Sequence, residues 1–306
     1  MSGLRRSSLF ILKLLLCFLL LGFVWNIAGG QQIFTALGDA DPFWLGIGFA
    51  VIMPQTILSA IRWRLVAARL GVDLAPATAV AEYYMAIFLN QVLPGGIAGD
   101  VTRVTRHGSA LRKGAPVHAS GQGYKVAAKA VVYERMAGQI AMVALSIPGL
   151  ALWRAEAAWG AAGLLAVLLA GAALTPAKGW LGRQIGDFRK SVLAWDGLYT
   201  QVILSGVIAG SYVFVFWCCV RALGIPFTAG TALTVLPPAL LAMAIPITPA
   251  GWGLREAAAV GMWIAAGMEA GDAAAASILY GLVNLAGALP GAAFLVSGAT
   301  REKGGA

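Results

Sequence analysis

The 306-residue chain is 59% hydrophobic and 11% charged, with a mean hydropathy of +0.80. Soluble domains carry about 25% charged residues, so this composition excludes an ordinary soluble protein. Several apolar stretches reach the ~20 residues that cross a ~30 Å hydrocarbon core as a helix. The sequence therefore predicts an all-α, polytopic helical bundle, with residues 1–306 forming a single transmembrane domain.

The net charge of +9 has two interpretations. A basic chain can bind a polyanion, but Lys and Arg also collect in the cytoplasmic loops of membrane proteins and fix their orientation. No basic run interleaved with aromatic residues occurs here. We therefore favour the second interpretation and expect no nucleic-acid partner.

The predicted spans follow from apolar runs bounded by charged loops. About seven or eight crossings are expected, in the order Ser8–Ala28, Phe43–Ala60, Val126–Leu152, Ala155–Leu174, Leu198–Arg221, a short span ending near Gly267, and Ala274–Ser297, together with one or two broken segments. The basic N-terminus also resembles a signal peptide. We favour an uncleaved first span in the inner membrane, with the N-terminus in the cytoplasm.

Two apolar segments are interrupted by proline and glycine. Basic residues lie on both sides of Thr78–Leu93, which predicts a re-entrant segment that starts and ends on the cytoplasmic side. The segment Thr231–Thr248 has two interpretations. A full crossing gives eight spans and places both termini in the cytoplasm, which the charges at the chain ends favour. A re-entrant path would place the C-terminus on the opposite side.

The two interruptions resemble each other. Pro94-Gly95-Gly96 lies 155 residues before Pro249-Ala250-Gly251, and each is soon followed by an acid and an arginine. A gapless alignment places Asp100 opposite Arg255. Paired interrupted segments are a pointer to a transporter's binding site, where the N-terminal ends of half-helices favour anions. The alternative is two ordinary turns in a chain with 39 Gly and 13 Pro.

Charged residues inside predicted spans are the second signal. Glu134 and Arg135 lie in an apolar span, where a lone charge costs about 2.5–3.5 kcal/mol. Neighbouring helix residues point in different directions, so each is expected to pair with another segment. Arg255 and Glu256 are also charged residues beside an apolar span, so they too are expected to have partners. Such residues are candidates for function, and the alternative is that they only fix helix packing.

Other polar residues give weaker signals. Arg62 and Arg64 lie at the predicted end of a span, where they are expected to snorkel as anchors or to contact lipid phosphates. His107 and His118 are eleven residues apart in a basic loop, which does not match zinc ligands on a helix. No catalytic motif is present, and we predict neither a metal nor a cofactor.

These motifs together resemble a known family. They are Arg62-Trp63-Arg64, the stretch Phe88–Gly96 with Gly99-Asp100 and Arg103, Glu134–Gly138, and Pro246–Glu256. The chain is similar to the lysylphosphatidylglycerol synthase transmembrane-region family, also called the flippase-like domain family. The sequence departs from the family pattern in two places. Glu134 stands where aspartate is common, and Ala250-Gly251 stands where two glycines are common.

The resemblance implies a lipid-translocating region. In the best-known members a separate cytoplasmic domain attaches lysine or alanine to phosphatidylglycerol. This chain ends at Ala306, soon after its last predicted span, so we expect a stand-alone member without the aminoacyl-transfer domain.

Our first hypothesis is a lipid translocase that moves an amphiphile with an anionic head group, or a lipid-linked precursor, between leaflets of a bacterial inner membrane. The candidate substrate-binding residues are Asn90, Asp100, Arg103, Glu134, Arg135, Arg255, Glu256, Arg62 and Arg64. The alternative is a membrane-embedded enzyme, or an accessory subunit, in glycolipid, hopanoid or lipid-linked precursor assembly. In that case the intramembrane glutamate would act as a base. A structural scaffold is a third interpretation. A homo-oligomer and a partner biosynthetic enzyme stay open as further partners.

Overall fold

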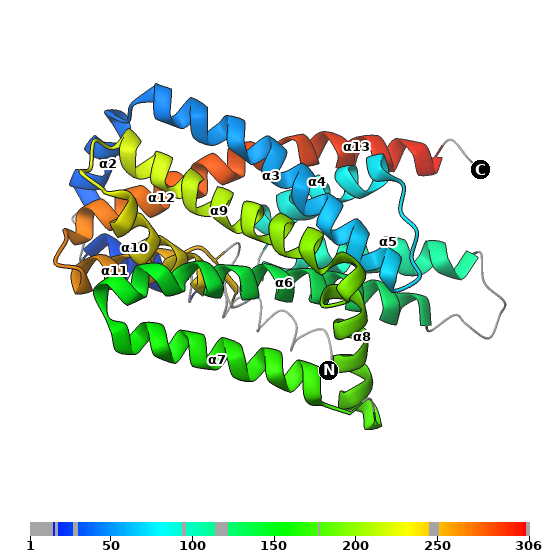
Figure 1. Ribbon diagram of the computed structural model, residues 1–306. Coiled ribbons are helices and arrows are strands. Elements are labelled where there is room, and N and C mark those ends of the chain that lie inside the picture. The colour runs from blue at the N-terminus through cyan, green and yellow to red at the C-terminus, as the bar shows by residue number, and fades with distance from the viewer. Residues whose placement is uncertain are drawn as a thin grey trace.

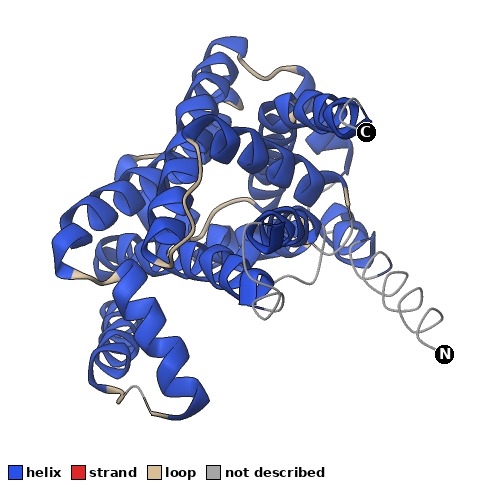
Figure 2. Cartoon of the chain, turned by 90° about the vertical axis from the view of Figure 1, so that its right-hand side faces the viewer, coloured by secondary structure: helices blue, strands red, loops and turns tan. Residues whose placement is uncertain are grey.

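A computed structural model describes residue 15 and residues 18–26, 30–93, 96–113, 122–176, 178–244 and 251–303. Within these residues the regular structure is entirely helical, which confirms the all-α prediction (Figure 2). Five stretches are long and apolar enough to cross a membrane: Pro42–Arg69, Gly123–Trp153, Ala155–Ala172, Gly179–Ala222 and Ala270–Ser297. The chain is therefore a polytopic helical membrane protein. The predicted first span, Ser8–Ala28, is described only at residue 15 and residues 18–26, which are helical.

The predicted spans beginning at Phe43, Val126, Ala155, Leu198 and Ala274 overlap these five stretches. The predicted full crossing at Thr231–Thr248 and the short span ending near Gly267 coincide with helices of only 13 and 12 residues, which are too short to be among them. In chain order the helices are α2 (Gly30–Gly38), α3 (Pro42–Arg69), α4 (Pro76–Val92), α5 (Ala98–Lys113), α6 (Gln122–Trp153), α7 (Ala155–Leu174), α8 (Gly179–Val192), η2 (Trp195–Gly197), α9 (Leu198–Ala222), α10 (Ala229–Leu241), η3 (Ala242–Ala244), α11 (Leu254–Ala265), α12 (Ala270–Ala288) and α13 (Pro290–Lys303). The last predicted span is divided at Pro290, whose ring and missing N–H favour the start of a new helix.

The long helices α3 and α9 pack antiparallel and define the two ends of the bundle. At one end the Asp41 backbone N–H donates to the Ala222 carbonyl at 2.8 Å. At the other end Arg69 pairs with Asp196 at 3.6 Å between Nη2 and Oδ1. The start of α3 therefore lies beside the end of α9, and the end of α3 lies beside η2 at the start of α9.

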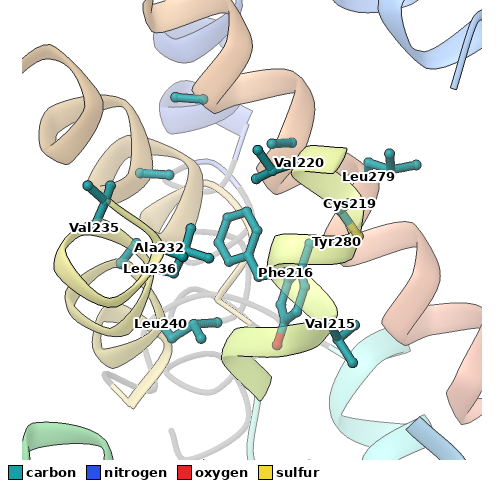
Figure 3. Packing of buried hydrophobic residues seen from close by; sticks show 14 of the residues in the cluster. Val215, Phe216, Cys219, Val220, Ala232, Val235, Leu236, Leu240, Leu279 and Tyr280 are labelled. Atoms are coloured by element: carbon teal, nitrogen blue, oxygen red, sulfur yellow. The ribbon is translucent and has the colours of Figure 1, made fainter. Parts of the chain in front are cut away.

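An apolar cluster joins α9 to α10, α11 and α12. Phe216 stacks on Tyr280 with ring centroids 4.7 Å apart (Figure 3). Val235 and Leu236 of α10 belong to the same cluster and are completely buried. Lipid tails are as apolar as this cluster, so close packing rather than exclusion of water holds the helices together.

Helices α4 and α5 form a helical hairpin. At the open end of the hairpin, its base, Glu82 Oε1 lies 3.6 Å from Arg106 Nε. At the turn between the helices, its tip, the Asn90 side-chain oxygen accepts a hydrogen bond from the Gly99 backbone N–H at 2.8 Å. These contacts join residues progressively closer in sequence, so the two helices run antiparallel. The base follows directly after Arg69 and therefore lies at the end of the bundle where α3 ends.

Helices α10 and α11 form a second hairpin. At its base, the ring of Phe227, before α10, stacks on the ring of Trp263 near the end of α11, with ring centroids 5.0 Å apart. At its tip, Gly251 lies against Met243 in η3. Its base follows Ala222, at the opposite end of the bundle from the first base. In Figure 1, α10 and α11 lie near α2, whereas α4 and α5 lie toward the other end.

The order of long helix, hairpin and long helix therefore occurs twice, with opposite directions. Corresponding helices begin at residues 42 and 198, 76 and 229, 98 and 254, and 122 and 270. Asp100 and Glu256 are each the third residue of the second hairpin helix. This correspondence replaces the gapless alignment, which placed Asp100 opposite Arg255.

The two helices of the first hairpin touch at Gly99. A Cβ at this position would lie 2.0 Å from the Ala86 carbonyl oxygen. We expect Gly99→Ala to force α4 and α5 apart and to lower the midpoint of thermal unfolding in detergent, because overpacking costs about 1–3 kcal/mol.

Gly206→Ala in α9 is the matched control, since nothing lies within 4 Å of the Cβ it would add. There alanine should be neutral or stabilising by up to about 1 kcal/mol. An unchanged midpoint for Gly99→Ala would contradict the close approach of the two helices.

Candidate functional site

A cavity of about 210 Å³ lies between the four long helices and the tips of both hairpins. Asn90, Gln91 and Gly96 line it from the first tip, and Leu240 and Met243 line it from the second. The two interrupted segments, far apart in sequence, thus reach one shared space. The long helices supply the remaining lining: Ile52, Gln55, Thr56, Arg62, Glu134, Arg135, Gly138, Gln139, Met142, Ile208, Ala209, Tyr212, Asn284 and Ala288, with Tyr83 and Ile87 from α4.

Arg62 and Glu134 form a buried ion pair that joins α3 to α6. Arg62 Nη2 and Nε donate to Glu134 Oε1 at 2.5 and 3.1 Å, and Tyr83 donates to the same oxygen at 3.3 Å. The predicted snorkelling of Arg62 is wrong. Helix α3 continues past the predicted span end, so Arg62 lies inside the bundle with only 4% of its surface exposed.

Arg135 pairs with Asp100, which joins α6 to the first hairpin. Arg135 Nη2 lies 2.5 Å from Asp100 Oδ2, and Arg103 donates to the other carboxylate oxygen. Arg103 is buried, with its guanidinium 4.8 Å from the Trp63 ring and 4.6 Å from the Tyr83 ring. About half of the Arg135 side chain (47%) is accessible, and it faces the cavity.

The expectation that Glu134 and Arg135 have partners on other segments is confirmed, since their partners lie on α3 and α5. Asp100 and Arg103 do not line the cavity. They lie behind Arg135 and hold its guanidinium in place. Asp100 also sits in the first turn of α5, where its charge is stabilised by the helix dipole.

The tip of the first hairpin is fixed by Asn90. Its side-chain oxygen accepts from the Gly99 N–H, one of the free amide groups at the start of α5. Asn90 therefore both closes the hairpin and lines the cavity. Pro94 and Gly95 lie outside the described residues.

Arg255 and Glu256 lie apart from the cavity. They pair with each other, and Arg255 Nε also donates to Ser277 at 3.0 Å. Glu256 Oε2 accepts from the Gly253 N–H at 2.6 Å, which caps α11. Neither residue is among those that line the cavity, since the glutamate folds back onto its own helix start and pairs with the arginine. The stretch 245–250 before them lies outside the described residues.

Arg64 also lies apart from the cavity. Its Nε donates to the Leu74 carbonyl at 2.6 Å and so ties the end of α3 to the turn before α4. It does not contribute to the cavity lining.

Glu82 and His107 form a buried pair that the sequence did not predict. They connect α4 and α5 near the hairpin base, with the His107 ring 5.1 Å from Trp63. His118, considered with His107 as a metal ligand, lies outside the described residues. Among the residues that the structure describes, no three His, Cys, Asp or Glu side chains could hold a metal together.

The comparison with protein families agrees with this architecture. The model of the family "Lysylphosphatidylglycerol synthase TM region" matches residues 10–291. The chain belongs to this family. The match includes every helix that lines the cavity and both hairpins. No curated protein and no solved structure matches the chain.

Sequence reasoning missed several lining residues of this family member. Gln55, Gln139 and Asn284 lie in apolar helices and face the cavity. A signal for them exists, since an amide in a membrane-spanning helix is costly unless it meets protein or water. Asn90 stands out in the sequence because it adjoins the Pro-Gly interruption, whereas these three amides lie within uninterrupted apolar stretches.

The Arg62–Glu134 pair makes a prediction about stability. Glu134→Ala should destabilise the protein by about 3–5 kcal/mol, because it leaves the Arg62 charge buried without its partner. The double variant Arg62→Met with Glu134→Leu should recover most of this loss, since buried ion pairs can be replaced by apolar groups of similar volume. Thermal unfolding in detergent measures both. A double variant as unstable as the single one would contradict this account of the pair.

Proposed function

We propose that the protein is a lipid translocase, which moves an amphiphile with an anionic head group between the leaflets of a membrane. The observation that carries the proposal is the cavity, with an accessible arginine, between membrane-spanning helices and the two hairpin tips. In this proposal the head group enters the cavity while the acyl chains stay in the bilayer.

The lining of the cavity supports this division. It combines the charged Arg135 with the amides of Gln55, Asn90 and Gln139. A polar head group finds hydrogen-bond partners there, whereas acyl chains are already solvated by the lipid around the helices. A charged head group would exchange its water for Arg135 and the neighbouring amides, which lowers the cost of leaving the interface.

The opposed hairpins support movement between two sides. We infer that both are re-entrant, with α4–α5 entering from one face of the membrane and α10–α11 from the other. Together with their flanking helices they form two halves of inverted topology. In transporters of this kind the substrate site lies between the halves, and rocking of one half against the other opens it to alternate sides.

The half-helix starts have a different role from the one expected. Asp100 and Glu256 already place a carboxylate in the first turn of α5 and α11. The partial positive charge at the N-terminus of each helix is therefore already balanced by a carboxylate of the protein. We assign the attraction for an anionic head group to Arg135 instead.

The proposal is tested in proteoliposomes that contain acyl-labelled anionic phospholipid, by following the loss of outer-leaflet label with a membrane-impermeant quencher. Wild-type protein should accelerate exchange over protein-free liposomes, with and without an imposed proton gradient. We expect Arg135→Gln to slow exchange about tenfold or more, since a hydrogen bond to a charged group contributes about 1.5–3 kcal/mol.

Lys125→Gln is the matched control, because this exposed lysine lies on the same helix and does not line the cavity. It should exchange lipid at the wild-type rate. Exchange no faster than in empty liposomes, or an Arg135→Gln rate equal to wild type, would contradict the proposal. A chemically altered lipid in the same vesicles would favour the membrane-enzyme alternative.

A further inference from the structure

Helix α8 runs across the direction of α6 and α7 instead of along it (Figure 1). It follows α7, whose 20 residues are long enough to cross the bilayer. Tyr133 of α6 donates to the Gln184 carbonyl of α8 at 2.9 Å. Arg69, at the end of α3, donates to the Ser191 carbonyl at 3.3 Å. A helix that crosses the ends of membrane-spanning helices lies in the plane of the membrane, at the depth of the lipid head groups.

One face of α8 packs on the bundle, and other side chains of the segment point away from it. Phe188 and Val192 are buried against α3 and α6. By contrast, Trp180 and Leu181 at the start of α8 have 69% and 60% of their surface exposed, and Trp195 in η2 has 91%. Tryptophan collects at the head-group level, where its ring meets lipid and its N–H meets water. These exposed side chains therefore fit a membrane surface.

The segment is basic, and its positive charge is not balanced by its own acids. Residues 178–197 contain the cations Lys178, Arg183, Arg189 and Lys190 and the acids Asp187 and Asp196. Both acids pair with a cation from another helix, Asp187 with Lys129 at 2.6 Å and Asp196 with Arg69 at 3.6 Å. Arg183 and Lys190 are exposed, and no acid in the described part of the chain forms an ion pair with either of them. A partner that complements this surface is therefore negatively charged.

The two exposed cations lie on one side of the helix. Arg183 and Lys190 are seven residues apart, which is two helical turns or about 10 Å along the axis. Asp187 lies between them on the same side, and Lys129 neutralises it. Trp180, three residues before Arg183, adjoins this side. Basic and aromatic side chains are thus combined on a helix that lies in the membrane plane.

We propose that α8 is an interfacial helix that binds anionic phospholipids of the leaflet on its side of the membrane. Arg183 and Lys190 contact the lipid phosphates, and Trp180 and Leu181 insert among the head groups. Anionic lipids are attracted to basic segments at the membrane surface, and the arginine fork matches a phosphate. This lipid is distinct from one inside the cavity, because α8 contributes no residue to the cavity lining.

The test uses phosphatidylcholine nanodiscs in which a small fraction of the lipid carries a nitroxide on its acyl chain, close to the head group. A fluorophore on Leu181→Cys, in a chain whose native cysteines are replaced, reports which lipids contact α8. Nitroxide-labelled phosphatidylserine and phosphatidylcholine are compared at equal mole fraction. We expect phosphatidylserine to quench about threefold more strongly at low salt, because each basic side chain near the surface attracts anionic lipid. This preference should disappear at about 0.5 M salt, where exposed charges are screened.

The double variant Arg183→Gln with Lys190→Gln should bring the quenching by the two lipids to nearly equal values. Its thermal unfolding midpoint should stay at the wild-type value, since neither side chain has an ion-pair partner in the described part of the chain. Lys125→Gln with Arg154→Gln is the matched control. It removes the same charge from two exposed positions outside α8 and should keep the wild-type preference for phosphatidylserine.

Three outcomes would overturn the proposal. Quenching by neither lipid would place α8 away from the bilayer. Equal quenching by both lipids in the wild type would remove the anionic lipid as the partner, and a cross-link from Lys190 to an acidic protein in native membranes would then assign this surface to a protein. A preference that persists in the double variant would exclude Arg183 and Lys190 as its source. None of these outcomes depends on whether the protein moves lipid between leaflets.

Discussion

The buried ion pair between Arg62 and Glu134 is the interaction on which the centre of the molecule depends. Each charge alone would be costly inside an apolar bundle, and together they fix α3 against α6. Gly138 allows this approach, because a Cβ there would lie 3.0 Å from Arg62 Nη2. With α3 and α6 held in this way, the second carboxylate oxygen of Glu134 is buried, and no hydrogen-bond donor among the described residues reaches it.

A second charge network extends this arrangement to the first hairpin. Asp100 links Arg135 on α6 to Arg103 on α5, and Arg103 is held by the rings of Trp63 and Tyr83. The hairpin tip is therefore tied to the long helices by charge as well as by packing. The second hairpin has its own network, in which Arg255, Glu256 and Ser277 join α11 to α12. Both hairpin tips are thus positioned around one polar space.

The symmetry of this arrangement gives the proposed function its physical basis. Two halves with opposite directions, each contributing two long helices and one hairpin tip, enclose a cavity that belongs to neither half alone. A small relative rotation of the halves would change which side the cavity faces without rebuilding the site. Under the proposed function, the lining, which includes the accessible Arg135 and several amides, would select the head group.

Much of this could be predicted from the sequence. The hydropathy of the sequence predicts a helical membrane protein. The proline and glycine interruptions mark the two turns at which the hairpins reverse direction. The isolated charges Glu134 and Arg135 indicated partners on other helices, which the structure confirms. These signals are local or follow from the cost of a charge in lipid, so they are readable without three-dimensional information.

The remaining features depend on tertiary contacts. The burial of Arg62 was missed because hydropathy ends a span at the first charged residues, whereas α3 continues to Arg69. The pairing of Arg255 with Glu256 was missed because neighbouring helix residues normally diverge. Here the glutamate reaches back to cap its own helix. Whether an amide such as Gln55 faces lipid or cavity is set by helix rotation, which a single apolar stretch does not specify.

The central claim, that the two hairpins enter from opposite faces of the membrane, is tested most directly by cysteine accessibility. Ala77→Cys and Ala229→Cys place one thiol at the exposed base of each hairpin, in a chain whose native cysteines are replaced. A membrane-impermeant thiol reagent is applied to vesicles of each orientation. The account predicts that Ala77→Cys reacts in one orientation and Ala229→Cys only in the other. Reaction of both from the same side would contradict it.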